Sequence, residues 1–206
     1  MNDTAFTVFI VDDDSAVLRA LSRLLRAAAY QTQTFSSSRE FLAKHEPSVP
    51  GCAIFDVALP DLDGLELQRS LSVGGVDRPI IFITGKGDIP TSVRAMKAGA
   101  VDFLTKPVSA DDLLVAIARA RQVEAQARQT RSERALIEAR LARLTLRERE
   151  VLTHVVAGKL NKQIAGDLGT VEKTIKVHRG RMMHKLGVRT VQDLVRLAGR
   201  AGIGLP

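Results

Sequence analysis

The sequence has a single cysteine, no tryptophan and no long apolar run. One cysteine, Cys52, excludes both a disulfide within the chain and a cysteine-rich zinc site, so we expect it to be a small buried side chain. No apolar stretch approaches the roughly 18 residues that cross a bilayer, and the N-terminus lacks the pattern of a secretory signal. We therefore expect a cytoplasmic protein with no membrane association.

Aromatic residues and prolines are nearly absent from the second half of the chain. All eight Phe and Tyr residues lie before position 104, and six of the seven prolines lie at or before Pro107. We therefore expect the second half to be a separate domain, helical throughout. Without aromatic side chains on which bases stack, it is a poor candidate for binding single-stranded DNA or RNA.

Positive charge is concentrated in the same part of the chain. The net charge is +7, but residues 1–120 carry 12 Lys and Arg against 15 Asp and Glu, whereas residues 143–206 carry 13 against 5. A basic domain joined to an acidic one suggests that the basic part meets a polyanion, most simply nucleic acid. The alternative is an ordinary solvated basic surface.

The first half alternates short β-branched or aromatic runs with amphipathic segments, a pattern typical of βαβ units. The expected strands are Thr7–Val11, Gln31–Phe35, 53–55, Ile80–Thr84 and Asp102–Thr105, and the expected helices are 16–29, 39–45, 64–72 and 91–98. Nearly all of these strands are apolar, as in a sheet covered by helices on both faces. The pattern predicts an α/β domain built on a doubly wound, five-stranded parallel sheet.

The remaining sequence predicts helices only. Residues 108–157 contain neither Gly nor Pro, which favours a long helix from Ala110 to about Ala142, although a flexible linker is the alternative. After it, a capping box at Thr145, a helix capped by Asn161, a helix over 171–186 and a fourth opened by Thr190 predict an all-α helix-turn-helix domain. We divide the chain into a domain at 1–120, a helical linker at 121–142 and a domain at 143–206, which we expect to fold without residues 1–142.

Polar side chains follow the predicted strands at the point where each strand ends. Asp12 and Asp13 follow the first strand, Asp56 ends the third, Thr84 ends the fourth and Lys106 follows the fifth. The carboxyl ends of parallel strands meet at one edge of a sheet, where ligands bind in doubly wound folds. Three carboxylates repel one another unless a cation balances them, and oxygen-only ligands suit Mg²⁺.

This pocket favours phosphoryl chemistry. The carboxylate of Asp56 is placed to act as a nucleophile toward phosphorus, with Lys106 and the Thr84 hydroxyl placed to pair with the phosphoryl oxygens. Each residue taken singly has a simpler explanation; Asp14, for example, is expected to cap the following helix. The simpler explanations are weaker for all five strand-end residues together.

These motifs resemble the receiver domain of bacterial two-component response regulators of the FixJ/NarL family, nearest the FixJ-like branch. The resemblance rests on VDDD at 11–14, FDVALP at 55–60, DG at 63–64, ITGKGDIP at 83–90, AMKAGAVDF at 95–103 and TKP at 105–107. It implies the flavodoxin-like strand order 2-1-3-4-5 and a cis Lys106–Pro107 bond. It also assigns the site residues: phosphoacceptor Asp56, Mg²⁺ ligands Asp12, Asp13 and Asp56, switch residues Thr84 and Phe103, and phosphate-pairing Lys106.

Departures from this pattern are small. Leu59 stands where these receivers usually have Met, and Ala58 and Lys86 occupy positions that, by resemblance, tune the lifetime of the phosphoryl group. Ala58 also argues against a phosphatase of the haloacid dehalogenase type, which needs a second aspartate there. A flavodoxin is disfavoured because no Ser/Thr/Gly phosphate loop follows the first strand.

The basic tail resembles the LuxR-type helix-turn-helix. The resemblance rests on LTLREREVL at 144–152, NKQIA at 161–165, EKTIKVH at 172–178 and MHKLGV at 183–188. On the helix over 171–186, Ile175, Met182 and Leu186 share a face suited to the core. Lys176 is suited to guanine acceptors in the major groove and Val177 to a thymine methyl. The expected phosphate contacts are Lys162, Lys173, Thr174, Arg179 and Arg181.

Two further points about this tail concern a helix cap and two histidines. Val171 stands where the family commonly has a Ser or Thr cap, which makes Thr170 the alternative cap. His178 and His184 are interpreted as structural or phosphate-facing residues rather than metal ligands.

Together these resemblances imply a transcription regulator rather than an enzyme. A sensor histidine kinase would phosphorylate Asp56, and the phosphorylated receivers would form a homodimer through a surface near Val93 and Lys97. The dimer would bind double-stranded promoter DNA and, if it activates transcription, RNA polymerase. A regulator whose DNA binding ignores phosphorylation is the remaining alternative.

Overall fold

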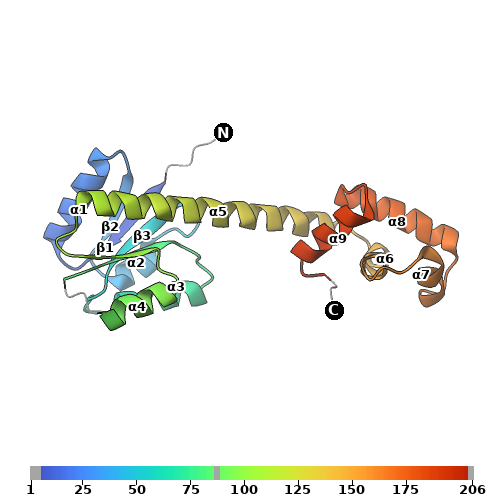
Figure 1. Ribbon diagram of the computed structural model, residues 1–206, viewed down its shortest axis with the longest axis horizontal. Coiled ribbons are helices and arrows are strands. Elements are labelled where there is room, and N and C mark those ends of the chain that lie inside the picture. Colours follow the sequence, from blue (N-terminus) through green and yellow to red (C-terminus); the bar gives the residue numbers. More distant parts are fainter. Residues whose placement is uncertain (1–5, 86–88, 204–206) are drawn as a thin grey trace. The chain divides into compact units, whose positions relative to one another are not determined.

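The computed structural model describes residues 6–85 and 89–203. The chain divides into two compact units between Arg128 and Gln129 (Figure 1). This division lies within a single helix, α5 (Ala110–Ala142), so the predicted 121–142 segment is helical and contributes to both units. Its boundaries at 121 and 142 stay a prediction. Among the described residues, no helix is both long enough and apolar enough to span a membrane.

The first unit is built on a five-stranded parallel sheet in the order β2-β1-β3-β4-β5, as predicted. The strands are β1 (Thr7–Val11), β2 (Gln31–Phe35), β3 (Gly51–Asp56), β4 (Ile80–Thr84) and β5 (Asp102–Thr105). Four of them have the predicted bounds. β3 begins two residues earlier than predicted, at Gly51, where a Cβ would lie only 1.9 Å from the carbonyl oxygen of Thr7. Only glycine fits at that start.

Helices cover both faces of this sheet (Figure 1). Helices α1 (Ser15–Ala27) and α5 cover one face, and α2 (Ser38–Lys44), α3 (Gly64–Val73) and α4 (Ile89–Lys97) cover the other. Asp14 caps α1, as predicted, by accepting from the Ala16 N–H at 2.7 Å. Cys52 is fully buried among the α1 and α5 side chains, and this burial raises the pKa of its thiol to about 12.

The second unit is all-α. It contains α6 (Leu146–Val156), α7 (Asn161–Asp167), α8 (Glu172–Leu186) and α9 (Val191–Arg200), together with the last turns of α5. The predicted core residues Ile175, Met182 and Leu186 are fully buried. Ile137 and Leu141 of α5 lie in the same apolar cluster. The core of this unit therefore includes residues that precede the predicted boundary at 143.

The helix ends of this unit agree with the sequence in three places and differ in two. Thr190 caps α9, as predicted, by accepting from the Asp193 N–H at 3.1 Å. Thr145 and Glu148 form the predicted capping box, and Gly187 ends α8 in the left-handed region at φ 68°. Asn161, however, is the first residue of α7 rather than its cap. Thr170 does not cap α8, because the N-cap is Val171, whose apolar side chain accepts no hydrogen bond. The N–H of Thr170 instead donates to the carbonyl of Ala165 in the turn before α8.

Candidate functional site

The predicted strand-end residues converge at the carboxyl edge of the sheet. Asp12, Asp56 and Thr84 are buried, Lys106 is half-buried and Asp13 is exposed. Carboxylate oxygens of Asp12, Asp13 and Asp56 all lie within 4.8 Å of one another. Parallel pairing of β1 with β3, and of β3 with β4, brings these ends side by side. The edge is thus a small acidic pocket with one side open to solvent.

Lys106, directly after β5, places its ammonium group in this pocket. Its Nζ donates to Oδ2 of Asp12 at 2.8 Å and to Oδ2 of Asp56 at 2.6 Å. Its backbone N–H donates to the carbonyl of Thr84 at 2.7 Å, and the Lys106–Pro107 bond is cis, as the resemblance implied. One cation therefore bridges the two buried carboxylates, which agrees with the predicted position of Lys106.

Burial and charge act in opposite directions in the pocket. Burial raises the pKa of Asp12, although the hydrogen bonds from Lys106 and the Asp14 N–H partly offset this. Burial alone would lower the pKa of Lys106, but its hydrogen bonds to Asp12 and Asp56 outweigh burial and raise it. The hydrogen bonds to Asp12 thus offset only part of the effect of burial, and its pKa stays raised. Three carboxylates that offer only oxygen donors, one of them at the solvent side, fit a hard divalent cation such as Mg²⁺.

The two predicted switch residues lie beside this edge on β4 and β5. Thr84 is buried at the end of β4. Phe103, on β5, is half-buried and packs against Phe82 with ring centroids 6.4 Å apart. Lys86, to which we assigned a part in the lifetime of the phosphoryl group, lies outside the described residues. Ala58 is exposed, and its N–H donates to Oδ1 of Asp56 at 3.1 Å.

Sequence reasoning missed the role of Asp61, in the loop between β3 and α3. Its carboxylate accepts from the Arg39 N–H at 2.9 Å and the Ser38 N–H at 3.3 Å, at the start of α2. Burial alone would raise the pKa of Asp61, but the hydrogen bonds from backbone N–H groups outweigh burial and lower it. The buried Ser38 hydroxyl donates back to the carbonyl of Leu62 at 2.7 Å. The loop that follows Asp56 is therefore fixed to α2.

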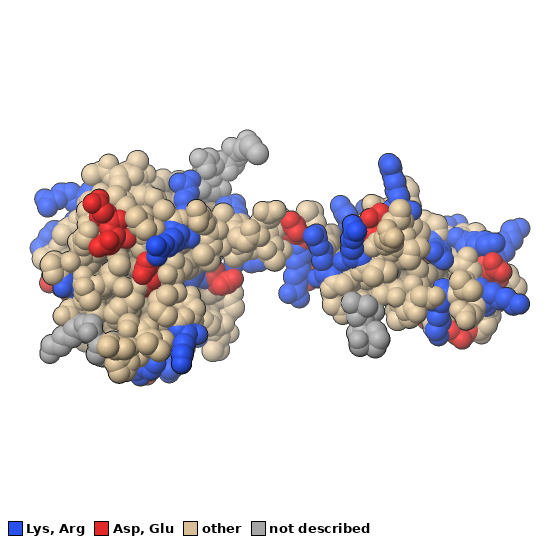
Figure 2. Space-filling model, in the orientation of Figure 1, with Lys and Arg blue, Asp and Glu red and all other residues tan. Residues whose placement is uncertain are grey.

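The second unit presents a basic surface that includes α8. Lys and Arg are scattered over the visible face of this unit and predominate over Asp and Glu there, whereas the visible face of the first unit shows both signs more evenly (Figure 2). Lys173, Lys176, Val177 and Arg181 of α8 and Lys162 of α7 are exposed, and Thr174 is half-buried. The Nζ of Lys176 lies 3.2 Å from a carboxylate oxygen of Glu172, one turn earlier. Exposed basic residues on a helix opposite its core face are suited to a nucleic-acid groove.

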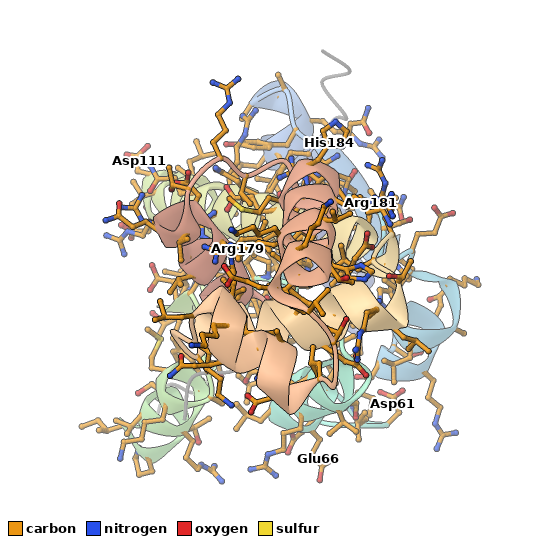
Figure 3. The ribbon with its side chains drawn as sticks, turned by 90° about the vertical axis from the view of Figure 1, so that its right-hand side faces the viewer. Asp61, Glu66, Asp111, Arg179, Arg181 and His184 are labelled. Atoms are coloured by element: carbon orange, nitrogen blue, oxygen red, sulfur yellow. The ribbon has the colours of Figure 1, made fainter. Side chains whose placement is uncertain are left out.

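Arg179 differs from the other predicted contacts because it has a partner inside the protein. Its guanidinium donates to Oδ1 of Asn161 at 2.9 Å and so joins α8 to α7. Arg179 and Arg181 project from opposite sides of α8 (Figure 3). Asn161 thus holds the neighbouring helix instead of capping its own. A phosphate contact by Arg179 stays a prediction.

Several other cations hold helix ends, a use that the sequence did not reveal. Arg140 donates to the carbonyl of Leu186 at 3.3 Å, Arg147 to that of Leu168, and Arg149 to that of Leu141 at 2.9 Å. These carbonyls belong to the last turns of helices or to their caps, which carry partial negative charge. Part of the positive charge of this unit therefore also has a structural role, because it joins one helix to the end of another.

The two residues expected near a dimer surface are both exposed on α4. Val93 is 44% exposed, and Lys97 lies one turn further along the helix. α4 also exposes Ile89 and Met96. The helix therefore has an uncovered apolar surface, and its use in pairing stays a prediction.

A doubly wound sheet with an aspartate cluster and a lysine at its carboxyl edge defines a receiver domain, and it is followed here by a helix-turn-helix unit. The model of the response regulator receiver domain matches residues 8–118, and that of the luxR family of bacterial regulatory proteins matches residues 142–198. The chain belongs to the two-component response regulators of the FixJ/NarL family. This domain pair makes it a transcription regulator and implies a histidine kinase partner and DNA as the ligand.

Relatives agree over almost the whole chain. The response regulator protein TmoT of Ectopseudomonas mendocina is 46% identical over 200 residues, which cover 97% of this chain and 91% of that protein. The transcriptional regulatory protein FixJ of Rhizobium meliloti is 40% identical over 201 residues and 98% of both chains. The solved structure of the response regulator StyR matches with a TM-score of 0.83 and 44% identity over 95% of this chain and 99% of that one. These relatives are regulators, which favours the regulator over the phosphatase and flavodoxin alternatives.

Proposed function

We propose that a partner histidine kinase transfers a phosphoryl group to Asp56 and that this transfer switches DNA binding by α8. The observation that carries the proposal is the Lys106 ammonium group, which lies 2.6 Å from Asp56 and 2.8 Å from Asp12 inside a cluster of three carboxylates. Such a pocket has an acceptor oxygen, a cation to pair with the incoming phosphoryl group and ligands for a metal ion.

The chemistry is a nucleophilic displacement at phosphorus. A carboxylate oxygen of Asp56 bonds to phosphorus while the bond from phosphorus to the kinase histidine nitrogen breaks, and the histidine is released as neutral imidazole. Mg²⁺ held by Asp12, Asp13 and Asp56 would neutralise charge on the phosphoryl oxygens. Lys106 then exchanges its contact with Asp56 for a phosphoryl oxygen, and the hydroxyl of Thr84 donates to another. The same pocket loses the group slowly by hydrolysis.

The response to phosphorylation is a shift on the β4–β5 side of the sheet. Thr84 moves toward the phosphoryl group, and Phe103 turns inward into the space that Thr84 leaves. The exposed surface that includes Val93 and Lys97 then pairs with a second phosphorylated copy. A homodimer places two copies of α8 on two half-sites of promoter DNA, which raises both affinity and specificity.

On the DNA, the exposed face of α8 enters the major groove. Lys176 donates to guanine acceptors and Val177 contacts a thymine methyl. Phosphate contacts come from Lys162, Lys173, Thr174, Arg179 and Arg181, which fix register without reading sequence. RNA polymerase would be a further partner if bound promoters are activated.

The test is binding to a random double-stranded DNA library, sequenced after selection, with and without Mg²⁺ and beryllofluoride as a phosphoryl mimic. We expect a motif of two half-sites to be enriched only with the mimic. The same motif in both conditions would mean that DNA binding ignores phosphorylation, and no motif in either would overturn the assignment of α8. The Asp56→Asn variant is the control, because it should not respond to the mimic.

A further inference from the structure

The recognition helix α8 carries a glycine in its interior. Gly180 lies eight residues after the start of the helix at Glu172 and six before its end at Leu186. Glycine inside a helix is disfavoured relative to alanine by roughly fivefold in the folding equilibrium, because the unfolded chain loses more freedom. Helix stability alone would therefore favour alanine over glycine at this position.

The fold itself supplies no reason for a glycine at this position. Other glycines are required by a close neighbour, as at Gly64, where a Cβ would lie 2.5 Å from the carbonyl oxygen of Asp56, or by a positive φ, as at Gly187. A Cβ on Gly180 would meet nothing within 4 Å among the described residues, and its φ lies outside the positive region. Gly166 and Gly199 also have open space, but both lie in the last turn of their helices.

Gly180 lies on the outward-facing side of α8, away from the core. Residues three or four apart share a helix face, so Gly180 is a neighbour of Lys176 and Val177 on one side and of His184 on the other. These three neighbours are exposed and the fourth, Met183, is half-buried, whereas Ile175 and Met182 on the opposite face are fully buried. Figure 3 looks onto α8 and places His184 and Arg181 on it. Gly180 thus lies within the surface that we assign to DNA.

We propose that Gly180 is the point at which the α8 backbone lies directly against base edges in the major groove, and that its missing side chain is a determinant of sequence specificity. The inference rests on the proposed role of α8. A helix with side chains is about 10–12 Å across and the groove is about 12 Å wide, so one added carbon at the contact holds the helix away from the bases. Glycine is the residue that allows such close approach of backbone to ligand.

The experiment uses the full chain with Mg²⁺ and beryllofluoride, and compares Gly180→Ala and Gly180→Leu with the parent. Both changes should raise the thermal midpoint of the second unit, because both add helix propensity. Affinity for the DNA site selected from the random library should fall roughly fivefold or more with alanine, and further with leucine. Affinity for unrelated DNA should stay unchanged, because such complexes depend on phosphate contacts.

Gly199→Ala is the matched control, since it makes the same change at an open position on another helix and should leave both affinities unchanged. Unchanged affinity of Gly180→Ala for the selected site, or an equal fall on both DNAs, would overturn the inference. Lys176→Ala separates this failure from a failure of the proposed function. If it loses discrimination while Gly180→Ala does not, only the role of Gly180 is wrong; if neither variant is affected, α8 is not the reading helix.

Discussion

The guanidinium of Arg140, near the end of α5, donates a hydrogen bond to the carbonyl oxygen of Leu186, the last residue of α8. Helix α5 therefore also holds the C-terminal end of α8. Ile137 and Leu141 of α5 are likewise buried in the core of the second unit. This core therefore includes residues that come before the boundary at 143, which stays a prediction.

The sequence alone led us to expect that residues 143–206 fold by themselves. Because Ile137 and Leu141 belong to the core, we now predict that a fragment of residues 129–206 folds cooperatively and that a fragment of residues 143–206 does not. Loss of a buried leucine or isoleucine costs about 2–5 kcal/mol, which is a large part of the stability of a domain this small. Thermal unfolding followed by circular dichroism measures the difference. Equal midpoints for the two fragments would show that α5 is not part of the core.

We predict that Asp56→Asn abolishes phosphoryl incorporation from a small-molecule phosphodonor. Asparagine keeps the shape of the side chain but lacks the nucleophilic carboxylate. Asp63→Asn is the control, because Asp63 caps α3 by accepting from the Glu66 N–H, a role that asparagine also fills. Labelling is measured by intact mass, and undiminished incorporation in Asp56→Asn would move the acceptor to another residue.

We predict that Glu148→Gln destabilises the second unit by about 2 kcal/mol. The buried Glu148 carboxylate accepts from Lys185 at 2.6 Å and from the Thr145 N–H at 2.9 Å. Burial alone would raise the pKa of Glu148, but these hydrogen bonds outweigh it and lower the pKa below its ordinary 4.5. The contribution is therefore complete above pH 4.5 and is lost as pH falls through the lowered folded-state value.

Denaturant unfolding at a series of acidic pH values measures this effect. The parent should lose stability on acidification more steeply than Glu148→Gln. Glu150→Gln is the control, because Glu150 is a half-exposed carboxylate of the same helix, paired with Arg147. Parallel pH profiles for the parent and Glu148→Gln would contradict the role of the buried pair.

We predict that Lys176→Ala lowers discrimination between DNA sites, by about 1–3 kcal/mol, more than it lowers general affinity. Lys162→Ala should instead weaken binding to all sequences alike and reduce the dependence of log K on log salt by about 0.9. Titrations of selected and unrelated DNA at several salt concentrations measure both quantities. Equal losses on all sequences for Lys176→Ala would refute a base-reading role.

We predict that Val93→Asp prevents receiver pairing in the presence of Mg²⁺ and beryllofluoride, because it puts a charge into an apolar contact. Val73→Asp is the matched control, since Val73 is 90% exposed on α3, outside the proposed surface. Sedimentation velocity measures the oligomeric state. A dimer of Val93→Asp as stable as that of the parent would place the pairing surface elsewhere.

The sheet and the acidic pocket could be predicted from sequence because both depend on local patterns. Four apolar strands stand out against their polar flanks, and the strand-end carboxylates follow directly from them. The start of β3 was missed because Gly51 has no β propensity; it is required there by the carbonyl of Thr7, 44 positions earlier. The order of the strands followed only from the family resemblance.

Contacts between distant residues could not be predicted in this way. Asn161 has the sequence signature of a cap, but Arg179 on another helix holds its side chain. In the sequence, nothing distinguishes Arg140 from other surface arginines, because its partner, the Leu186 carbonyl, is on α8. No local pattern predicts the role of Asp61, since its partners at the start of α2 lie 22 and 23 positions away. In each case the decisive partner is set by tertiary packing, which no local pattern records.

The burial of Cys52 has a practical consequence for following the switch. The only thiol of the chain is fully buried, with a pKa of about 12, so almost none of it is the reactive thiolate at neutral pH. A cysteine introduced at Val73, which is 90% exposed and outside the proposed surfaces, is then the single position that takes up a fluorescent or spin label. Distances between labelled copies can thus be followed in the otherwise native sequence, with no need to remove a competing thiol.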